Sequence, residues 1–373
     1  MVQLTSFSGI NLRCIEKVAI EDFGRLNVIA GANGAGKTSI LEGIYALASG
    51  RSFRTRQLAK LIRHGEEFLR VTGRVGAYEP GTVSTGVNEG SNGVHHIGLE
   101  RDRERLVIRC DGESVNRASD LARLLPTLVV RPESYEVLTG GSEERRRILD
   151  WTVFHVKPEF AEAHRGYNRA LKQRNALLKS PKGFNSAVLT PWTRELAAFG
   201  ERVEACRQEA WQEHKALIEA SIVAMTGVPV SMNYRRGWDQ NTELYQSLSE
   251  NIDSERERGT TMRGPHRADI RFVVDKEDAR QVLSRGEGKR LVLAFLLGMA
   301  QIVSLSKVHT PVFLLDDLAS ELDEDARAQF VESVLGTGFQ TFITTVDSSL
   351  IAAEYLSDAT VFHVKHGGVN RVL

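Results

Sequence analysis

Nine consecutive residues constrain the fold of this chain more than any other segment. They fit the pattern G-x-x-x-x-G-K-[ST] and are Gly31, Ala32, Asn33, Gly34, Ala35, Gly36, Lys37, Thr38 and Ser39. In such a loop the glycines permit a tight turn whose backbone N–H groups face phosphate oxygens. The lysine reaches the β- and γ-phosphates, and the next hydroxyl binds Mg²⁺. The sequence therefore predicts a nucleoside-triphosphate site at all nine residues, with Lys37 catalytic and Thr38 a metal ligand.

The flanking residues supply the secondary structure that this loop needs. Residues 26–30 (LNVIA) form a short apolar run typical of a buried strand, and apolar residues recur at helical spacing over 40–48. Gly50 is suited to end that helix. A bare motif match could be a glycine turn without a ligand. A strand before the loop and a helix after it favour an anion bound at the helix N-terminus.

A second element lies far along the chain. Residues 311–315 (PVFLL) predict a buried strand that ends at Asp316 and Asp317, and Ser320-Glu321-Leu322-Asp323 follows. A carboxylate in this position of a P-loop enzyme holds Mg²⁺. We therefore expect Asp316 to bind the metal through water and Asp317 to act catalytically by orienting the attacking water.

A third element precedes a long apolar run over residues 291–305. Ser284 suits the N-cap of a helix, so the simplest interpretation is a capped core helix. The pattern Ser284-x-Gly286 also resembles the ABC signature motif. In that family the signature of one subunit touches the γ-phosphate held by another. The resemblance implies that Ser284 is catalytic and that Gly286 binds nucleotide across a dimer.

The order P-loop, insertion, signature and Asp-Asp strand resembles the SMC-like ABC ATPase head. Five further segments resemble the RecF family of bacterial replication and repair proteins: 52–55, 132–141, 145–150, Tyr167 with 171–175, and 264–269, all lying between Arg13 and Asp347. The resemblance implies an α/β fold, a P-loop NTPase of the ABC/SMC-head type with an inserted helical arm domain. We expect the head to comprise residues 1–130 and 259–373, and the arm residues 131–258.

The chain departs from the family pattern at three places. Glu287 stands in the signature motif where the family usually has Gln, and a carboxylate there would repel a γ-phosphate. Arg13 is the only matching member of a segment on the nucleotide side, and it is expected to bind the nucleotide. Ser142 follows Gly141 where Pro is common.

The resemblance also implies a function and its partners. ATP and Mg²⁺ would be the cofactors, and ATP would join two chains head to tail around DNA, either duplex or single-strand/duplex junctions. The chain would be a weak, DNA-stimulated ATPase that supports recombinase loading at gaps and the SOS response. A RecR-like recombination mediator protein would be a partner, with no membrane involved. The switch position of transporters carries Thr345 in place of His, which suits slow turnover.

Two other function classes remain open. A nucleotide-gated scaffold without meaningful hydrolysis would share every motif, and Glu287 favours it slightly. An ABC transporter ATPase subunit would normally have Glu after the strand aspartate, a switch His and no large helical insertion. This chain has Asp317 and Thr345 at the first two positions, and a helical insertion before the signature.

Composition places the nucleic-acid surface in a local patch. The chain has 48 Lys and Arg against 48 Asp and Glu, so its net charge does not attract DNA. The candidate DNA contacts are Arg54, Arg56 and Lys60, and a helical stripe of Arg165, Arg169 and Lys172.

Three scattered cysteines favour a cytoplasmic location over a disulfide framework. The longest apolar run is shorter than a membrane helix and predicts a core helix.

Overall fold

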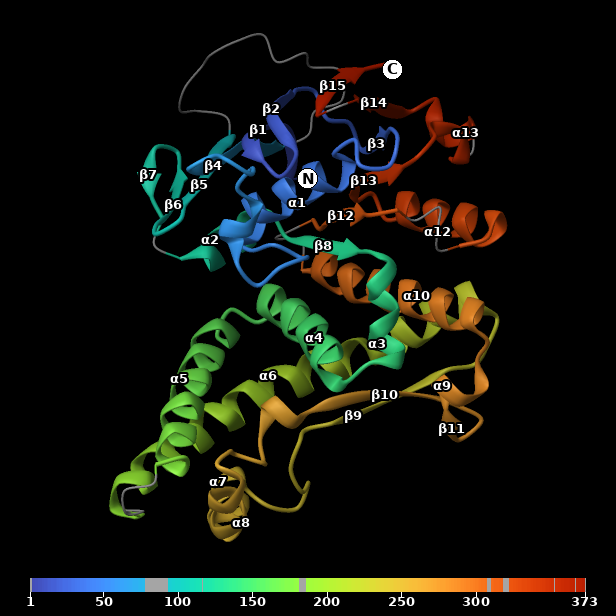
Figure 1. Cartoon of the computed structure of the whole chain (residues 1–373). Coiled ribbons are helices and arrows are strands. Elements are labelled where there is room, and N and C mark those ends of the chain that lie inside the picture. The colour runs from blue at the N-terminus through green and yellow to red at the C-terminus, as the bar shows by residue number, and fades with distance from the viewer. Residues whose placement is uncertain are drawn as a thin grey trace. The chain divides into compact units, whose positions relative to one another are not determined.

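The computed structural model describes residues 2–77, 93–115, 117–180, 186–306, 310–317, 322–351, 353–365 and 367–372. The chain divides into two compact units, Met1–Ser134 with Val303–Leu373, and Tyr135–Ile302 (Figure 1). The first unit therefore combines segments from both parts of the chain. Residues 259–302, which we expected in the head, group with the helical unit. The Gly-, Ser-, Thr- and Asn-rich composition of residues 76–95 predicts a surface loop, most of which lies outside the described residues.

A six-stranded sheet in the first unit has the order β15-β14-β3-β13-β12-β8. Its parallel strands are β3 (Leu26–Ala30), β8 (Thr127–Val130), β12 (Val312–Leu315), β13 (Gln340–Thr345) and β14 (Ala359–Lys365), while β15 (Gly368–Arg371) is antiparallel. Every residue of β3, β12 and β13 is buried, as expected for central strands of a sheet covered on both faces. The mostly apolar sequences of β3 and β12 predict this burial, whereas β13 (QTFITT) is largely polar.

An antiparallel sheet lies beside it, with the order β2-β1-β4-β5-β6-β7. Its strands are β1 (Val2–Leu12), β2 (Ile15–Ile20), β4 (Phe68–Ala77), β5 (His95–Asp102), β6 (Leu106–Cys110) and β7 (Glu113–Ser114). Helix α1 (Lys37–Ser49) packs between the two sheets, because its Ile40 and Leu41 share one apolar core with Phe7 and Phe342. A Cβ at Gly43 would lie 2.6 Å from Phe7, so glycine permits this close approach.

Shorter elements complete the first unit. They are η1 (Leu58–Leu61), α2 (Ala118–Leu124), η2 (Pro132–Tyr135), α12 (Glu324–Gly336), η4 (Ser348–Leu350) and α13 (Ala353–Leu356). Asp323 caps α12, since its carboxylate accepts a 2.8 Å hydrogen bond from the Ala326 N–H. Phe313 of β12 stacks on Phe339 with ring centroids 5.7 Å apart.

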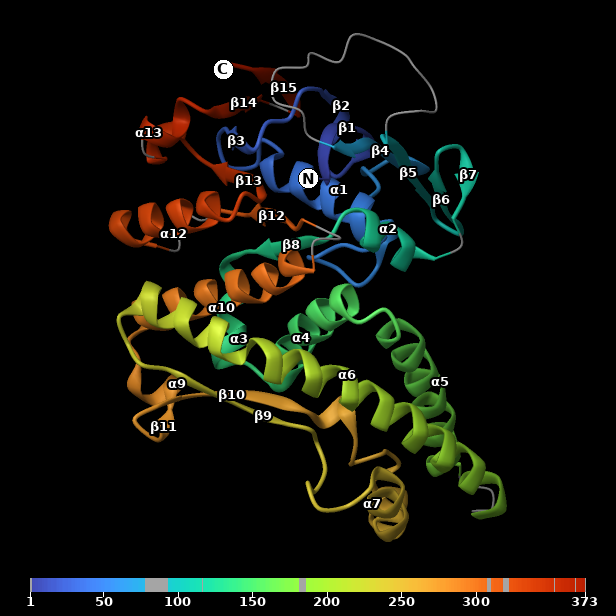
Figure 2. The same cartoon turned by 180° about the vertical axis from the view of Figure 1, so that it is seen from behind.

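The second unit is mostly helical. Its helices are α3 (Glu136–Thr139), α4 (Ser142–Val156), α5 (Phe160–Leu178), α6 (Ser186–Thr226), α7 (Leu244–Glu250), α8 (Ile252–Arg258), η3 (Pro265–Arg267), α9 (Ala279–Val282) and α10 (Arg285–Leu305). A small antiparallel sheet is formed by β9 (Ser231–Arg235), β10 (Asp269–Val274) and β11 (Glu277–Asp278). Helices α5 and α6 run side by side (Figure 2). The polar, helix-favouring composition of residues 159–179 and 191–225 predicts two long helices at these places.

Helix α10 is the predicted core helix. Among the described residues it is the one helix long and apolar enough to cross a membrane, and 72% of its most apolar window is buried within the fold. Its side chains at 291–297 are all buried, which is typical of a helix in the interior of a folded domain.

Candidate nucleotide site

The predicted phosphate-binding loop joins β3 to α1 and has the backbone that only glycine adopts freely. Gly31, Gly34 and Gly36 have φ values of 157°, 79° and 115°. A Cβ at Gly31 would lie 2.4 Å from the carbonyl oxygen of Val364, so β14 excludes any side chain there. A Cβ at Gly34 would meet nothing within 4 Å. The loop is thus closed against the sheet at Gly31 and open at Gly34, which fits a phosphate-binding cradle.

Lys37 is folded back over this loop. Its ammonium donates hydrogen bonds to the carbonyl oxygens of Gly31 at 2.6 Å and Ala32 at 3.0 Å. Burial lowers the pKa of Lys37, and the nearby charges of Asp317 and Asp316 partly offset that effect. No carboxylate of the described residues forms an ion pair with it. A phosphate in the loop would supply the charged partner that this buried ammonium needs.

The two predicted metal ligands, 278 positions apart in the chain, lie in direct contact. The Thr38 hydroxyl donates a 2.8 Å hydrogen bond to Oδ1 of Asp316, and the Thr344 hydroxyl donates to the same oxygen at 2.9 Å. Burial raises the pKa of Asp316, although both hydroxyl donors favour its charged form. The structure therefore places a hydroxyl and a carboxylate beside the loop, and such hard oxygen ligands are the kind Mg²⁺ prefers.

Asp317 occupies a strained turn directly after β12. Its φ is 53°, which is uncommon for a residue other than glycine, and its N–H donates a 2.9 Å hydrogen bond to the Thr344 hydroxyl. Thr344 therefore holds both aspartates, and the sequence analysis did not single it out. Thr345 is fully buried and its hydroxyl donates to the carbonyl oxygen of Asp347 at 2.9 Å.

Arg13, predicted to bind nucleotide, makes its contacts elsewhere in the structure. Its Nε and Nη2 donate to both carboxylate oxygens of Glu42 at 2.9 and 2.8 Å, and Nη1 donates to the carbonyl oxygen of Lys60 at 3.0 Å. Glu42 lies on α1, is fully buried and also accepts a hydrogen bond from Ser52. This bidentate pair fastens β1 to the P-loop helix. Glu42 was not predicted as a site residue, although it is the one carboxylate in the mostly apolar sequence of α1.

The signature segment opens α10 in the second unit. The Ser284 hydroxyl donates a 2.6 Å hydrogen bond to the Glu287 carboxylate, and the Ser284 N–H donates to it at 2.9 Å. In return the Glu287 N–H donates to the Ser284 hydroxyl oxygen at 3.3 Å. These reciprocal bonds form a capping box, and they lower the pKa of Glu287. A Cβ at Gly286 would meet nothing within 4 Å, so this turn is open to its surroundings.

The conspicuous segment at residues 264–269 is a scaffold of the second unit, buried at Gly264, Pro265 and Ala268 and exposed at Arg267. Arg145 pairs with Asp269 at 2.7 Å, and Arg146 donates to the carbonyl oxygen of Ala268 at 2.7 Å. His266 lies between the Tyr167 hydroxyl, 2.5 Å away, and the Thr261 carbonyl oxygen, 3.0 Å away. These contacts hold the 264–269 loop in place. They give the residues that resemble the RecF family at this segment a structural role.

The candidate DNA contacts all lie on the surface. Arg54, Arg56 and Lys60 are exposed in the first unit. Arg165 and Lys172 are exposed on α5, whereas the charge of Arg169 is partly neutralised by an ion pair with Glu195. Ser320 and Glu321 of the segment after Asp317 lie outside the described residues.

Comparisons with known proteins agree with this geometry. Residues 4–368 match the family model described as RecF/RecN/SMC N terminal domain. The chain is 33% identical to the DNA replication and repair protein RecF of Pseudomonas aeruginosa (strain LESB58) over 374 residues, 99% of this chain and 98% of that protein. It is 38% identical to the protein of that name from Chromohalobacter salexigens over 367 residues, 98% of each chain.

Solved structures show the same fold. The recombination mediator protein RecF-ATP in the RecFOR pathway superposes with a TM-score of 0.86 at 24% identity, covering 100% of this chain and 98% of that one. The SmcHead bound to the C-winged helix domain of ScpA gives a TM-score of 0.55 at 13% identity, covering 99% and 97%. The family model and the full-length relatives together show that this chain belongs to the RecF family of SMC-type ATPases.

Proposed function

We propose that this chain is an ATP-dependent DNA-binding protein of DNA replication and recombinational repair. The contact between Thr38 and Asp316 at the mouth of an intact P-loop carries the proposal, because it assembles a phosphate and metal site from both parts of the head. Full-length relatives that bear the name of a replication and repair protein support the biological role. That role includes support of recombinase loading at DNA gaps and of the SOS response.

The residues present fit ATP and Mg²⁺. The loop amides and Lys37 would hold the triphosphate, while Thr38 and Asp316 would hold the metal, the latter through water. When bound, Mg²⁺ neutralises charge that develops on the phosphoryl oxygens. Asp317 would orient the attacking water from its fixed turn. Catalysis then rests on positioned charge, with no covalent intermediate on the protein.

One head has only half of a working site in this proposal. Ser284 and Gly286 of a second copy would complete it, so ATP would join two chains head to tail and hydrolysis would release them. The exposed position of Ser284 and the open surroundings of Gly286 support such a contact. Turnover would be slow, because Thr345 cannot carry the charge of a switch histidine. The dimer would grip DNA in the cytoplasm and recruit a RecR-like mediator.

A comparison of ATPase rates with and without DNA tests this function. We expect purified chain to hydrolyse ATP slowly and to be stimulated by duplex DNA and by a gapped duplex. Lys37→Ala serves as the background control, because it removes the P-loop cation. An ATPase rate that equals this background under every condition would contradict the proposal.

One observation favours a second candidate, a nucleotide-gated scaffold that binds ATP without meaningful hydrolysis. The Ser284 hydroxyl is already bonded to the Glu287 carboxylate, which places negative charge where a γ-phosphate would arrive. ATP-dependent dimerisation without measurable phosphate release would support the scaffold over the ATPase.

A further inference from the structure

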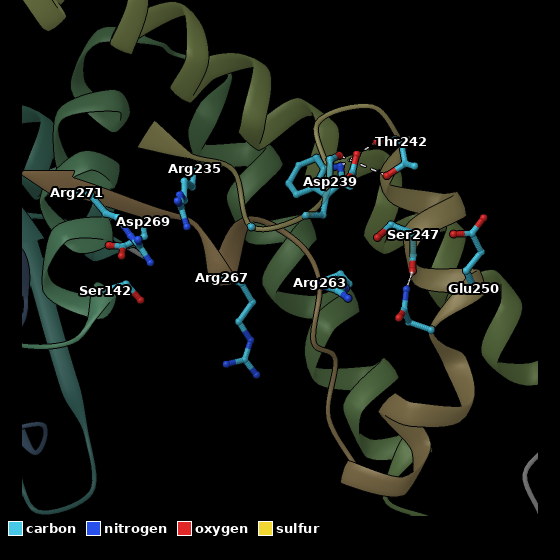
Figure 3. Close-up of a pocket in the computed structure, with 13 residues that line it drawn as sticks. Ser142, Arg235, Asp239, Thr242, Ser247, Glu250, Arg263, Arg267, Asp269 and Arg271 are labelled. Carbon is cyan, nitrogen blue, oxygen red and sulfur yellow. Dashed lines mark hydrogen bonds between the residues drawn. The ribbon is translucent and has the colours of Figure 1, made fainter. Parts of the chain in front are cut away.

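The second unit contains a cavity of about 640 Å³ that the ATPase function does not use (Figure 3). It lies where the end of β9 and the start of β10 meet the 263–267 loop and the second half of α7. Its lining is polar and includes Ser142, Thr242 and Ser247. This volume is in the range of pockets that accept a small ligand or a short peptide segment.

Four arginines give the lining of the cavity its positive charge. They are Arg235, Arg263, Arg267 and Arg271, and all four are exposed. None of them forms an ion pair with a carboxylate of the described residues. The strand pairing places Arg235 directly opposite Asp269, and Arg271 lies two residues further along β10 on the same face. Asp269 itself forms its ion pair with Arg145.

The backbone of the loop that carries Arg267 is held by hydrogen bonds from two buried or half-buried arginines. Arg207 donates to the Pro265 carbonyl oxygen at 2.8 Å, and Arg146 donates to the Ala268 carbonyl oxygen at 2.7 Å. A Cβ at Gly237 would lie 2.3 Å from the Gly264 carbonyl oxygen, so the two backbone segments are in close contact. Figure 3 shows Arg267 extending away from this support. Because the backbone is fixed, only the side chain of Arg267 has to become ordered when its planar guanidinium binds an anion.

Clustered arginines repel one another, and a bound anion would reduce this electrostatic repulsion. The carboxylates Asp239 and Glu250 also line the cavity, so its charge is mixed, and the closely and evenly spaced phosphates of a nucleic acid could not all avoid them. Trp238 is 6% exposed and covered by Arg236 at 4.4 Å, so it offers no free face on which a base could stack. A peptide with carboxylate side chains suits the cavity better, because its own N–H groups can bond to Asp239 and Glu250.

We propose that this cavity binds an acidic segment of a partner protein, with Arg267 and Arg271 as its principal carboxylate contacts. Bidentate arginine–carboxylate pairing is the expected mode. The proposal goes beyond the ATPase function and does not depend on it, since every residue involved belongs to the second unit.

Fluorescence anisotropy with a labelled hexaglutamate peptide tests the site. We expect the full chain to bind it, and to bind a hexaglutamine peptide at least tenfold more weakly. Arg267→Glu combined with Arg271→Glu should weaken hexaglutamate binding at least tenfold, while Arg267→Lys with Arg271→Lys should retain part of it. Lys276→Glu is the matched control, because Lys276 is an exposed cation in the turn after β10 and does not line the cavity. Thermal melting checks that each variant is folded.

Three outcomes would overturn the proposal. The first is unchanged hexaglutamate affinity in the folded double Glu variant. The second is an equal loss in Lys276→Glu, which would show attraction by overall charge. The third is displacement of the peptide by single-stranded or duplex DNA at lower concentration than by unlabelled hexaglutamate, which would make the cavity a DNA contact.

Discussion

The Ser284 hydroxyl and the Glu287 carboxylate are joined by a 2.6 Å hydrogen bond at the first turn of α10. The same carboxylate accepts the Ser284 N–H, so one side chain both starts the helix and occupies the hydroxyl of the signature motif. A γ-phosphate held by a second head would have to compete with Glu287 for that hydroxyl.

Glu287→Gln should strengthen ATP-induced dimerisation. Glutamine still accepts the Ser284 N–H and so keeps the cap, but it removes the charge that opposes the γ-phosphate. Relief of roughly 1 kcal/mol corresponds to about a fivefold lower ATP concentration at half-dimerisation, measured by analytical ultracentrifugation. Ser284→Arg, which should block dimerisation while sparing ATP binding, is the control. Unchanged dimerisation in both variants would place the trans contact elsewhere.

Lys37→Ala should abolish tight ATP binding. The substitution removes a desolvated cation that bonds to the Gly31 and Ala32 carbonyl oxygens. Loss of a charge-assisted contact to phosphate corresponds to about tenfold to hundredfold weaker affinity. Isothermal titration of ATP into the folded variant measures it, and the parent affinity in that experiment would refute the site.

Asp317→Asn should separate binding from hydrolysis. The amide has nearly the same size but lacks the charge that orients water, so we expect ATP affinity to persist while phosphate release falls by about hundredfold. The dimer should then remain on DNA, which a slower dissociation rate in a filter-binding assay would report. A parent-like hydrolysis rate would assign the water to another residue.

Reversing the charge of Arg54 and Arg56 should weaken DNA binding for all sequences alike. For every phosphate that the variant no longer neutralises, the slope of log K against log salt should become about 0.9 less steep for duplex DNA. ATP affinity should stay unchanged. Parent-like DNA affinity would move the DNA-binding surface to another patch, for which Arg165→Glu with Lys172→Glu on α5 is the next variant to measure.

Acidification should destabilise the protein through His266. Burial lowers its pKa to about 4, and the charges of Arg267, Arg146 and Arg207 add to the effect. Between about pH 6.5 and 4, His266 becomes protonated in the unfolded chain but stays neutral in the folded chain. The free energy of unfolding therefore falls as pH falls. The full shift corresponds to at most about 3 kcal/mol. Urea unfolding across this window should show a smaller pH effect in His266→Gln, and an identical slope would exclude the role.

The sequence predicted the contact partners best where a motif defines them locally. Thr38 and Asp316 could be paired in advance because each belongs to a motif that supplies an Mg²⁺ ligand, Thr38 at the start of α1 after the P-loop and Asp316 at the end of β12. Thr344 could not, since nothing marks it among the neighbouring threonines of β13 as the second donor to Asp316. The pairing of Arg13 with Glu42 likewise depends on how β1 packs against α1, which no local pattern specifies.

The run Arg145–Arg147 shows a similar limit. Consecutive helical residues point in different directions, so a basic run cannot have one role. Arg145 and Arg146 bond to Asp269 and the Ala268 carbonyl oxygen, whereas Arg147 pairs with Glu144 on its own helix. Arg145 and Arg146 therefore make structural contacts, whereas Arg147 lies on the solvated face of α4.

The position of β3 in its sheet has a consequence for synthesis of the protein. This strand carries the P-loop, and both of its neighbours, β13 and β14, come from residues 340–365. While the ribosome is still translating the helical unit, β3 has neither hydrogen-bonded neighbour and Asp316 does not yet exist. A nascent or prematurely terminated chain therefore lacks the strands and the aspartate that complete the candidate nucleotide site. Only a chain translated through β14 can close the sheet around β3, so the candidate site is assembled late in synthesis.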